Sequence, residues 1–192
     1  AEAIRAMGNK AGAKRLMEAA GVPCVPGYQG DDQSDTRMAQ EATRIGYPVM
    51  IKAAAGGGGR GMRVIEDEAT LATELDAARR EAEAAFGNDE VYLEKLVRRA
   101  RHVEVQILGD GQGSAIHLFS RDCSLQRRQQ KVLEEAPAPD IAEADSAALY
   151  RVCVDAAIAM NYRGAGTFEF LYQDQQFYFI EMNTRIQVEH PV

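Results

Sequence analysis

The last part of the chain alternates between apolar and polar residues with the period of two that is typical of β-strands. Residues 167–171 and 177–183 both show this pattern, and the polar segment between them predicts a hairpin. The faces expected to meet carry Thr167, Glu169 and Leu171 on the first strand and Phe177, Phe179, Glu181 and Asn183 on the second. With an odd-numbered loop at residues 174–176, Glu169 lies opposite Glu181 and Thr167 opposite Asn183.

The predicted pairing of Glu169 with Glu181 indicates a metal site. Two like charges directly opposite each other destabilise a sheet, whereas a divalent cation between them reverses that effect. Two carboxylates and the amide oxygen of Asn183 suit a hard cation, Mg²⁺ or Mn²⁺. The other interpretation is a pair of solvated glutamates on an exposed face. Polar residues continue at alternate positions beyond this strand, which favours the floor of an active site: Arg185, Gln187 and Glu189.

Residues 24–97 alternate between strand and helix patterns. We expect strands at 24–26, 47–53, 62–65 and 91–97, with helices at 34–45 and 67–86 that are each followed by glycine. This order is compact enough to be a small α+β lid. Residues 1–20, which precede it, are helical in character with a break near Gly8 and an end at Gly21.

A glycine-rich loop at residues 56–61 joins the second and third strands of this predicted lid. Such a run opposes both helix and strand, so it provides either mobility or a close approach of the backbone to a ligand. The Walker and Rossmann patterns require a helix straight after the glycines, and here a strand follows. We interpret the loop as a flap whose N–H groups fold over a triphosphate, with Lys52 neutralising phosphate charge; a bare linker is the alternative.

The middle of the chain predicts a second hairpin and a helix. Residues 102–108 and 114–119 are expected to be strands around a turn at 109–113, with His102 on the polar face. An amphipathic helix is expected at 143–161. The basic run 121–139 closes on two prolines and is predicted to be irregular; taken alone, it could equally be a surface loop. The fold class that results is α+β.

Composition limits the classes of function. The 192 residues are 46% hydrophobic with a formal net charge of -7, which permits a buried core and argues against nucleic acid or membrane as the main partner. Basic residues gather between 98 and 131 and suit a small anionic ligand. Three cysteines without metal-ligand spacing indicate free thiols in a reducing compartment. We expect no signal peptide or membrane span, and we expect the sequence to be an excerpt from a longer protein.

Several motifs together resemble biotin carboxylase of the ATP-grasp superfamily. They are residues 7–10 (Met-Gly-Asn-Lys), 51–62, 94–95, 101–104 (Arg-His-Val-Glu), 121–128, 134–139 (Glu-Glu-Ala-Pro-Ala-Pro) and 181–191. The resemblance covers essentially the whole chain and implies an α+β ATP-grasp fold in three parts. Residues 1–23 would be lead-in helices of the central domain, 24–97 the lid with its flap, and 98–192 a truncated central domain with an antiparallel sheet.

The resemblance also implies a role for each matching residue. ATP would contact Lys10, Lys52, Gly58, Gly59, His102, Gln126 and Gln129, with adenine at the strand edge Glu94, Lys95 and Val97. Glu169, Glu181 and Asn183 would bind Mg²⁺ or Mn²⁺. Bicarbonate would be held by Lys131, Arg185, Gln187 and Val188, with Glu189 as its general base. In that scheme bicarbonate attacks the γ-phosphorus of ATP, carboxyphosphate releases CO₂, and biotin is carboxylated at N1 while Arg185 stabilises its enolate.

The implied partners are a biotin carrier domain and a carboxyltransferase, in a homodimer located in the cytoplasm or the mitochondrial matrix. Gln129 stands where the family commonly has histidine, and Ala54 and Ala55 stand where serine and glycine are common. Two other functions remain open: a bicarbonate-activating ligase of the carbamoyl phosphate synthetase type, against which residues 185–190 argue, and a non-catalytic nucleotide-binding module. By itself the excerpt is expected to be inactive.

Overall fold

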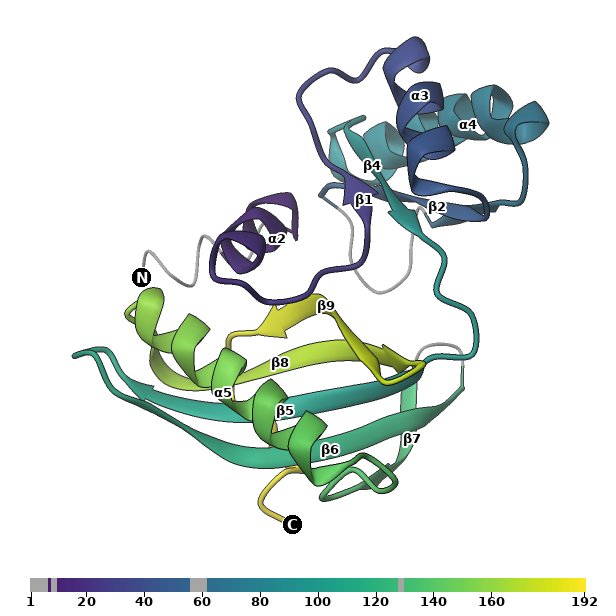
Figure 1. Ribbon diagram of the computed structural model, residues 1–192. Coiled ribbons are helices and arrows are strands. Elements are labelled where there is room, and N and C mark those ends of the chain that lie inside the picture. The colour runs from purple at the N-terminus through teal and green to yellow at the C-terminus, as the bar shows by residue number, and fades with distance from the viewer. Residues whose placement is uncertain (1–6, 8–9, 56–61, 128–129) are drawn as a thin grey trace. The chain divides into compact units, whose positions relative to one another are not determined.

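The computed structural model describes residues 7, 10–55, 62–127 and 130–192 (Figure 1). The chain folds into two compact units. The smaller unit is Val25–Arg98, and the larger unit consists of the residues up to Cys24 together with Arg99–Val192. Each unit has its own sheet and its own hydrophobic core. Among the described helices, none combines the length and the apolar character that a membrane crossing requires.

The smaller unit is a four-stranded antiparallel sheet with two helices. Its strands lie in the order β1 (Gly27–Tyr28), β4 (Val91–Lys95), β2 (Val49–Ala53) and β3 (Arg63–Ile65). The helices are α3 (Asp35–Ile45) and α4 (Glu68–Phe86), which share a core with β2 and β4. Alternate residues of β2 are buried, as expected for a sheet covered on one face.

Local signals account for the limits of both helices in this unit. The Ser34 side chain caps α3 by accepting a hydrogen bond from Arg37 N at 3.3 Å, and the Asp67 side chain caps α4 by accepting one from Ala69 N at 3.0 Å. Gly87 ends α4 in the left-handed conformation with φ 66°. The strand predicted at 24–26 is wrong. Cys24 belongs to the larger unit, where it forms a bridge to Phe179, and the first strand of the smaller unit is β1.

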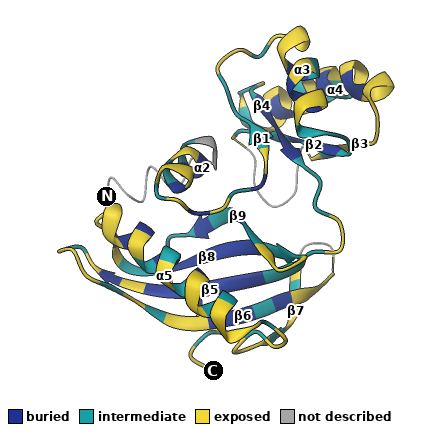
Figure 2. Ribbon diagram, viewed as in Figure 1, coloured by how far each residue is buried: buried dark blue, intermediate teal, exposed yellow. Residues whose placement is uncertain are grey.

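The larger unit is a five-stranded antiparallel sheet with helices packed on one face. The strands lie in the order β7 (Gln130–Glu135), β6 (Ala115–Arg127), β5 (Arg101–Asp110), β8 (Arg163–Gln173) and β9 (Gln176–Asn183). Helices α5 (Glu143–Ala159) and α2 (Lys10–Ala19) share a core with the apolar residues of β5, β8 and β9. Buried positions run along β5 and β8 beneath α5 (Figure 2). The sheet face turned away from α5 carries polar side chains.

The basic run after residue 120 is not irregular, as the sequence had suggested. Strand β6 continues to Arg127, and the chain returns as β7 from Gln130 to Glu135. Register shifts between Asp122 and Gln126 break the period of two, so the sequence pattern does not show the strands. The basic side chains of this run also form ion pairs, as Lys131 does with Glu104 of β5 and Glu169 of β8.

The hairpin of β8 and β9 has the predicted pairing but a different turn. Glu169 lies opposite Glu181 and Thr167 lies opposite Asn183, as expected. The turn, however, holds two residues, Asp174 and Gln175, both with positive φ (51° and 61°). A β-bulge after Glu169, where Phe170 pairs with Phe179, supplies the extra residue that the loop was expected to hold.

The same bulge corrects the predicted faces of β9. Phe179 and Met182 are both buried in the core, although they are three residues apart. Glu181 and Asn183 therefore lie on the face opposite to Phe179, and not with it as a strict period of two predicts. The polar end of the strand is thereby turned to the open face of the sheet.

Candidate active site

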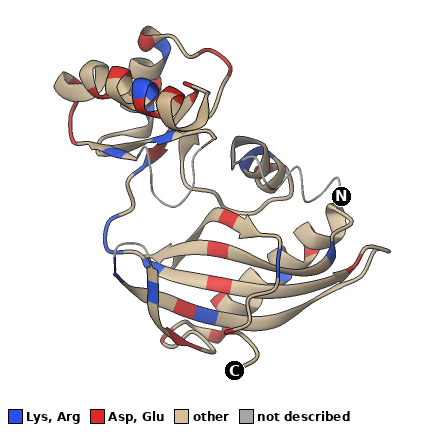
Figure 3. Ribbon diagram, turned by 180° about the vertical axis from the view of Figure 1, so that it is seen from behind, with Lys and Arg blue, Asp and Glu red and all other residues tan. Residues whose placement is uncertain are grey.

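The open face of the larger sheet gathers charged side chains from four strands. Glu104 of β5 lies opposite Arg121 of β6 on one side and opposite Glu169 of β8 on the other. His102 is two residues before Glu104, so it projects from the same face. Figure 3, which is turned by 180° from Figure 1, shows acidic and basic positions side by side across these strands.

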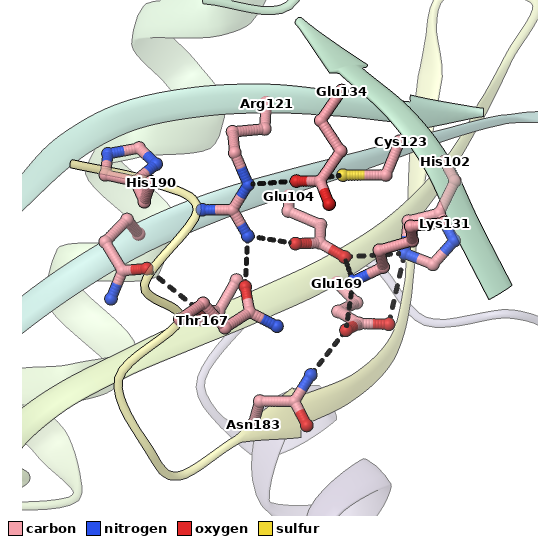
Figure 4. A network of polar contacts seen from close by, with 12 residues as sticks. His102, Glu104, Arg121, Cys123, Lys131, Glu134, Thr167, Glu169, Asn183 and His190 are labelled. Atoms are coloured by element: carbon pink, nitrogen blue, oxygen red, sulfur yellow. Dashed lines mark hydrogen bonds and ion pairs between the residues drawn. The ribbon is translucent and has the colours of Figure 1, made fainter. Parts of the chain in front are cut away.

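Glu104 is at the centre of this cluster and is fully buried. Its Oε2 accepts a hydrogen bond from Arg121 Nη2, and its Oε1 accepts one from Lys131 Nζ (Figure 4). Burial alone would raise the pKa of Glu104, but the neighbouring His102, the hydrogen bond from Lys131 and the charges of Lys131 and Arg121 outweigh it and lower the pKa to about 2. Glu104 is therefore a permanent buried anion at neutral pH.

Glu169 binds the ammonium group of Lys131 from the side opposite to Glu104. Lys131 Nζ lies 3.2 Å from Glu169 Oε1, and the Asn183 side-chain amide donates to that oxygen as well. Burial tends to lower the pKa of Lys131, but the charges of Glu169 and Glu104 outweigh it and raise the pKa. Lys131 is thus held as a cation between two carboxylates, at the surface of the sheet.

His102 lies between the two carboxylates as well. Its Nε2 is 3.1 Å from Glu104 Oε1 and 3.1 Å from Glu169 Oε2, and neither contact has the alignment of a hydrogen bond. Burial lowers the pKa of His102, but the two glutamates outweigh it and raise the pKa to about 9. On the other side, Gln126 Nε2 lies 3.0 Å from His102 Nδ1, a contact that favours the neutral ring. Because ion pairs are stronger than neutral hydrogen bonds, we take the ring to be protonated at neutral pH.

The ligand atoms of His102, Glu104 and Glu169 lie within 4.8 Å of one another, a spacing that a metal ion could use. A protonated imidazole cannot be a ligand, and both carboxylate oxygens of Glu104 are already bound by Arg121 and Lys131. This group is therefore better described as an ion-pair cluster. The free thiol of Cys123 is part of it, because Cys123 Sγ donates to Glu134 Oε2 at 3.5 Å. Burial and the charge of Glu104 raise the pKa of that thiol, so Cys123 is not a nucleophile.

Residues 184–192 follow β9 as an irregular tail that is fastened to the sheet at two points. Gln187 is 1% exposed, and its Oε1 accepts a hydrogen bond from Arg121 Nη2. His190 Nε2 lies 2.5 Å from Leu118 O. Arg185 and Glu189 remain exposed to either side of Gln187, and Val188 is 71% exposed. The tail therefore exposes the guanidinium of Arg185 and the carboxylate of Glu189 on either side of a residue that is held in place.

The larger unit thus brings together most of the predicted residues of its own part of the chain. Those in the cluster, or fastened to it, are His102, Gln126, Lys131, Glu169, Asn183 and Gln187. Glu181 is half-buried opposite Glu169, and Arg185, Val188 and Glu189 are in the tail. Lys10 begins α2, with its side chain outside the described part. Gly58, Gly59 and Gln129 lie outside the described residues.

The remaining predicted residues belong to the smaller unit. Lys52 Nζ forms an ion pair with Glu94, and both side chains are largely buried. Lys95 Nζ donates to Gly46 O at 2.8 Å and to Tyr47 O at 3.0 Å, so its ammonium group supports the loop before β2. Val97 is half-buried in the segment that follows β4.

Four residues of the cluster were not identified as functional from the sequence: Glu104, Arg121, Cys123 and Glu134. Glu104 has one usable signal, because it shares the polar face of a predicted strand with His102. Arg121 and Glu134 lie in the basic run for which the sequence predicts an irregular structure, and such a prediction assigns no face to a residue. Their burial depends on partners from other strands.

Comparison with known proteins identifies the family. A family model described as the ATP-binding domain of the carbamoyl-phosphate synthase L chain matches residues 9–192. The chain belongs to this family. Within it, the biotin carboxylase of Pseudomonas aeruginosa is 61% identical over 193 residues, which is 100% of this chain and 43% of that enzyme. The chain therefore spans less than half the length of this relative.

Solved structures of the same kind share the fold. A biotin carboxylase in complex with β,γ-ATP from Campylobacter jejuni matches with a TM-score of 0.93 and 50% identity, over 99% of this chain and 43% of that one. A biotin carboxylase domain dimer of the 2-oxoglutarate carboxylase from Hydrogenobacter thermophilus, in complex with MgADP, ADP and bicarbonate, matches with a TM-score of 0.92 and 46% identity, over 100% and 42%. The α+β ATP-grasp fold and the resemblance to biotin carboxylase, both predicted from the sequence, are confirmed.

Proposed function

We propose that the complete protein containing this chain carboxylates biotin with bicarbonate at the expense of ATP, through carboxyphosphate. The observation that carries this proposal is the position of Lys131. Its ammonium group is held between the ionised Glu104 and Glu169, and Arg121 ties the same Glu104 to the tail that bears Arg185. A small anion that reacts with a nucleotide needs such fixed cations. The H. thermophilus relative, in complex with MgADP and bicarbonate, supports the same assignment.

The metal ligands in this proposal are Glu169, Glu181 and Asn183. The donor set fits Mg²⁺ or Mn²⁺, because two carboxylates in register on adjacent strands and a nearby amide provide hard oxygen atoms. Asn183 now turns its Nδ2 to Glu169, so a shared cation would require the amide to turn over. When bound, the metal supplies positive charge against the phosphates.

The reacting anion is assigned to Lys131, Arg185, Gln187 and Val188. The Glu189 carboxylate takes the proton of bicarbonate. The oxygen that carried it forms a bond to the γ-phosphorus while the bond from that phosphorus to its bridging oxygen breaks, and ADP leaves with the electron pair. Carboxyphosphate then separates into CO₂ and phosphate. The phosphate takes the proton from biotin N1, and that nitrogen forms the new bond to the carbon of CO₂. Arg185 stabilises the negative charge of the biotin enolate.

Nucleotide binding is assigned to ten residues: Lys10, Lys52, Gly58, Gly59, Glu94, Lys95, Val97, His102, Gln126 and Gln129. Lys52 is the residue whose contacts would change most. It is paired with Glu94, so contact with phosphate requires it to leave or share that carboxylate. The wider assignments are a biotin carrier domain, a carboxyltransferase and a homodimer, in the cytoplasm or the mitochondrial matrix.

The test uses the full-length protein and measures ADP release with biotin or with ammonia as acceptor. Biotin-dependent release supports the proposal, and ammonia-dependent release would instead assign a ligase of the carbamoyl phosphate synthetase type. Arg185→Ala should leave nucleotide binding nearly intact and abolish biotin carboxylation, because within the described residues the exposed guanidinium donates a hydrogen bond only to the backbone oxygen of Ile186. Glu181→Gln should raise the Mg²⁺ concentration needed for half-maximal activity before it disturbs folding. Equal loss of nucleotide binding and carboxylation in Arg185→Ala would contradict the role assigned to that residue.

A further inference from the structure

Arg121 is a buried cation to which the proposed reaction assigns no role. It is 1% exposed, and it is among the largest fully buried side chains of the described residues. A buried guanidinium is costly unless acceptors surround it. Arg121 has three: Nη2 donates to Glu104 and to Gln187, and Nε lies 3.0 Å from Glu134 Oε2. The side chain thus connects three separate segments: β5, β7 and the tail (Figure 4).

The two contacts of Nη2 lead to the two halves of the proposed anion site. Through Glu104, Arg121 acts on Lys131, because the same carboxylate binds both cations. Through Gln187, it acts on the tail, in which Arg185 and Glu189 are each two residues away. Gln187 is the one buried residue between Thr184 and Val192. This nitrogen atom therefore fixes the tail to the charged cluster, while the contact of His190 with Leu118 O fixes it further along the chain.

Arg121 also determines which way the Gln187 amide points. A guanidinium has donors only, so the amide atom that faces it must be the oxygen. The NH₂ group of Gln187 is consequently directed away from Arg121. In the described structure no side chain or backbone group accepts a hydrogen bond from that NH₂ group, so it is available as a donor to an anion.

We propose that Arg121 is a positioning residue, which holds Gln187 and the tail in register with Lys131 so that the three can bind one small anion together. The inference rests on the proposed function for the identity of that anion, bicarbonate. Arg121 itself does not touch the reacting atoms. Its contribution is that the cations of the sheet and of the tail are already in place before the anion arrives.

The informative substitution is Arg121→Lys. Lysine keeps the buried charge, but its ammonium group is a single centre and cannot serve Glu104, Glu134 and Gln187 in the geometry of a planar fork. We expect the lysine to stay with the two carboxylates and to release the neutral amide of Gln187. Gln187→Ala removes the same link from the other side, and it does so outside the core of the sheet.

Both variants are examined in the full-length protein by steady-state kinetics and by amide hydrogen exchange. We expect the KM for bicarbonate to rise about tenfold or more, which is the effect of losing one hydrogen bond from a charged donor, while the KM for ATP changes little. Exchange in a peptide spanning residues 184–192 should become faster. Gln187→Ala should have the larger effect, because it also removes the amide assigned to the anion, and the double variant should resemble Gln187→Ala, because Arg121→Lys then has no link left to break.

Arg101→Lys is the matched control. Arg101 is the first residue of β5, and its Nε is 2.8 Å from Oδ2 of Asp122 on the neighbouring strand β6. Its other guanidinium nitrogens donate to the backbone oxygens of Asp140 and Pro139. It should leave both the bicarbonate KM and the tail exchange unchanged. The proposal is overturned if Arg121→Lys behaves like this control, if ATP and bicarbonate KM rise together, or if the effects of Arg121→Lys and Gln187→Ala add. Should the wild type release no ADP with bicarbonate and biotin, the proposed function fails, whereas the exchange measurement still tests the link.

Discussion

The two glutamates beside His102 should make this residue titrate far above the usual range of histidine. Its Nε2 lies 3.1 Å from an oxygen of each of Glu104 and Glu169, and the pKa is raised to about 9. The perturbation is Glu104→Gln, which removes one of the two charges and keeps the shape of the side chain. An opposite charge at this distance changes a pKa by about one to three pH units, so the variant should titrate lower by that amount.

The raised pKa also makes stability depend on pH. A rise from 6.5 to about 9 corresponds to about 3 kcal/mol of preference for the protonated form in the folded state. The folded pKa is above the unfolded one, so this stabilisation is complete below pH 6.5 and is lost as the pH rises through 9. The free energy of unfolding of His102→Gln should therefore approach that of the wild type as the pH increases over this interval.

Both effects can be measured in the full-length protein. NMR of ring-labelled histidine, with His102→Gln to assign the signal, gives the pKa, and denaturant unfolding at several pH values gives the stability. Glu134→Gln is the control, because Glu134 contacts Arg121 and Cys123 but not His102. A wild-type pKa near 6.5, or equal changes in the Glu104 and Glu134 variants, would refute the reasoning.

Two further predictions concern the sheet of the larger unit. Gly109→Ala in the buried part of β5 should destabilise the protein by about 1–3 kcal/mol in denaturant unfolding, because a Cβ there would lie 2.3 Å from Tyr162 O. Ser114→Ala, in the exposed turn that follows β5, should have little effect. Replacing Asp174-Gln175 by Asn-Gly should stabilise by roughly 1 kcal/mol, because both residues have positive φ, which costs glycine nothing; an unchanged or lower unfolding midpoint would count against that account.

The sequence was sufficient where a signal is local. Helices α3 and α4 begin at the caps Ser34 and Asp67 and end before a glycine, and each of these signals acts on residues no more than four positions away. The predicted helix limits agree with the structure within a residue. The hairpin of β5 and β6 has the same character, because Asp110 and the glycines that follow it form the turn. The strands of the smaller unit were found as well, except at its first edge, where Gly27–Tyr28 replaces the segment expected at 24–26.

The bulge in β9 shows where pattern reasoning reaches a limit. The pairing of Glu169 with Glu181 was predicted from a loop of odd length, and it arises from a two-residue turn and one extra residue within the strand. Both arrangements pair Glu169 with Glu181, but the predicted one puts Phe179 and Glu181 on the same face and the observed one puts them on opposite faces. The burial of Met182 settles the difference, and burial is a property of the folded sheet.

The charged cluster could not be foreseen for a related reason. Arg121 and Lys131 have the sequence signature of a solvated basic loop, and their surroundings are set by Glu104 and Glu169, which are 17 and 38 residues away along the chain. A buried charge is tolerated only when all of its partners are present, so neither its burial nor its role can be assigned to a single segment. This dependence also indicates why such residues are suited to positioning. Because each cation is shared by carboxylates from different strands, moving any one strand would break several ion pairs, and the site is as rigid as the sheet that carries it.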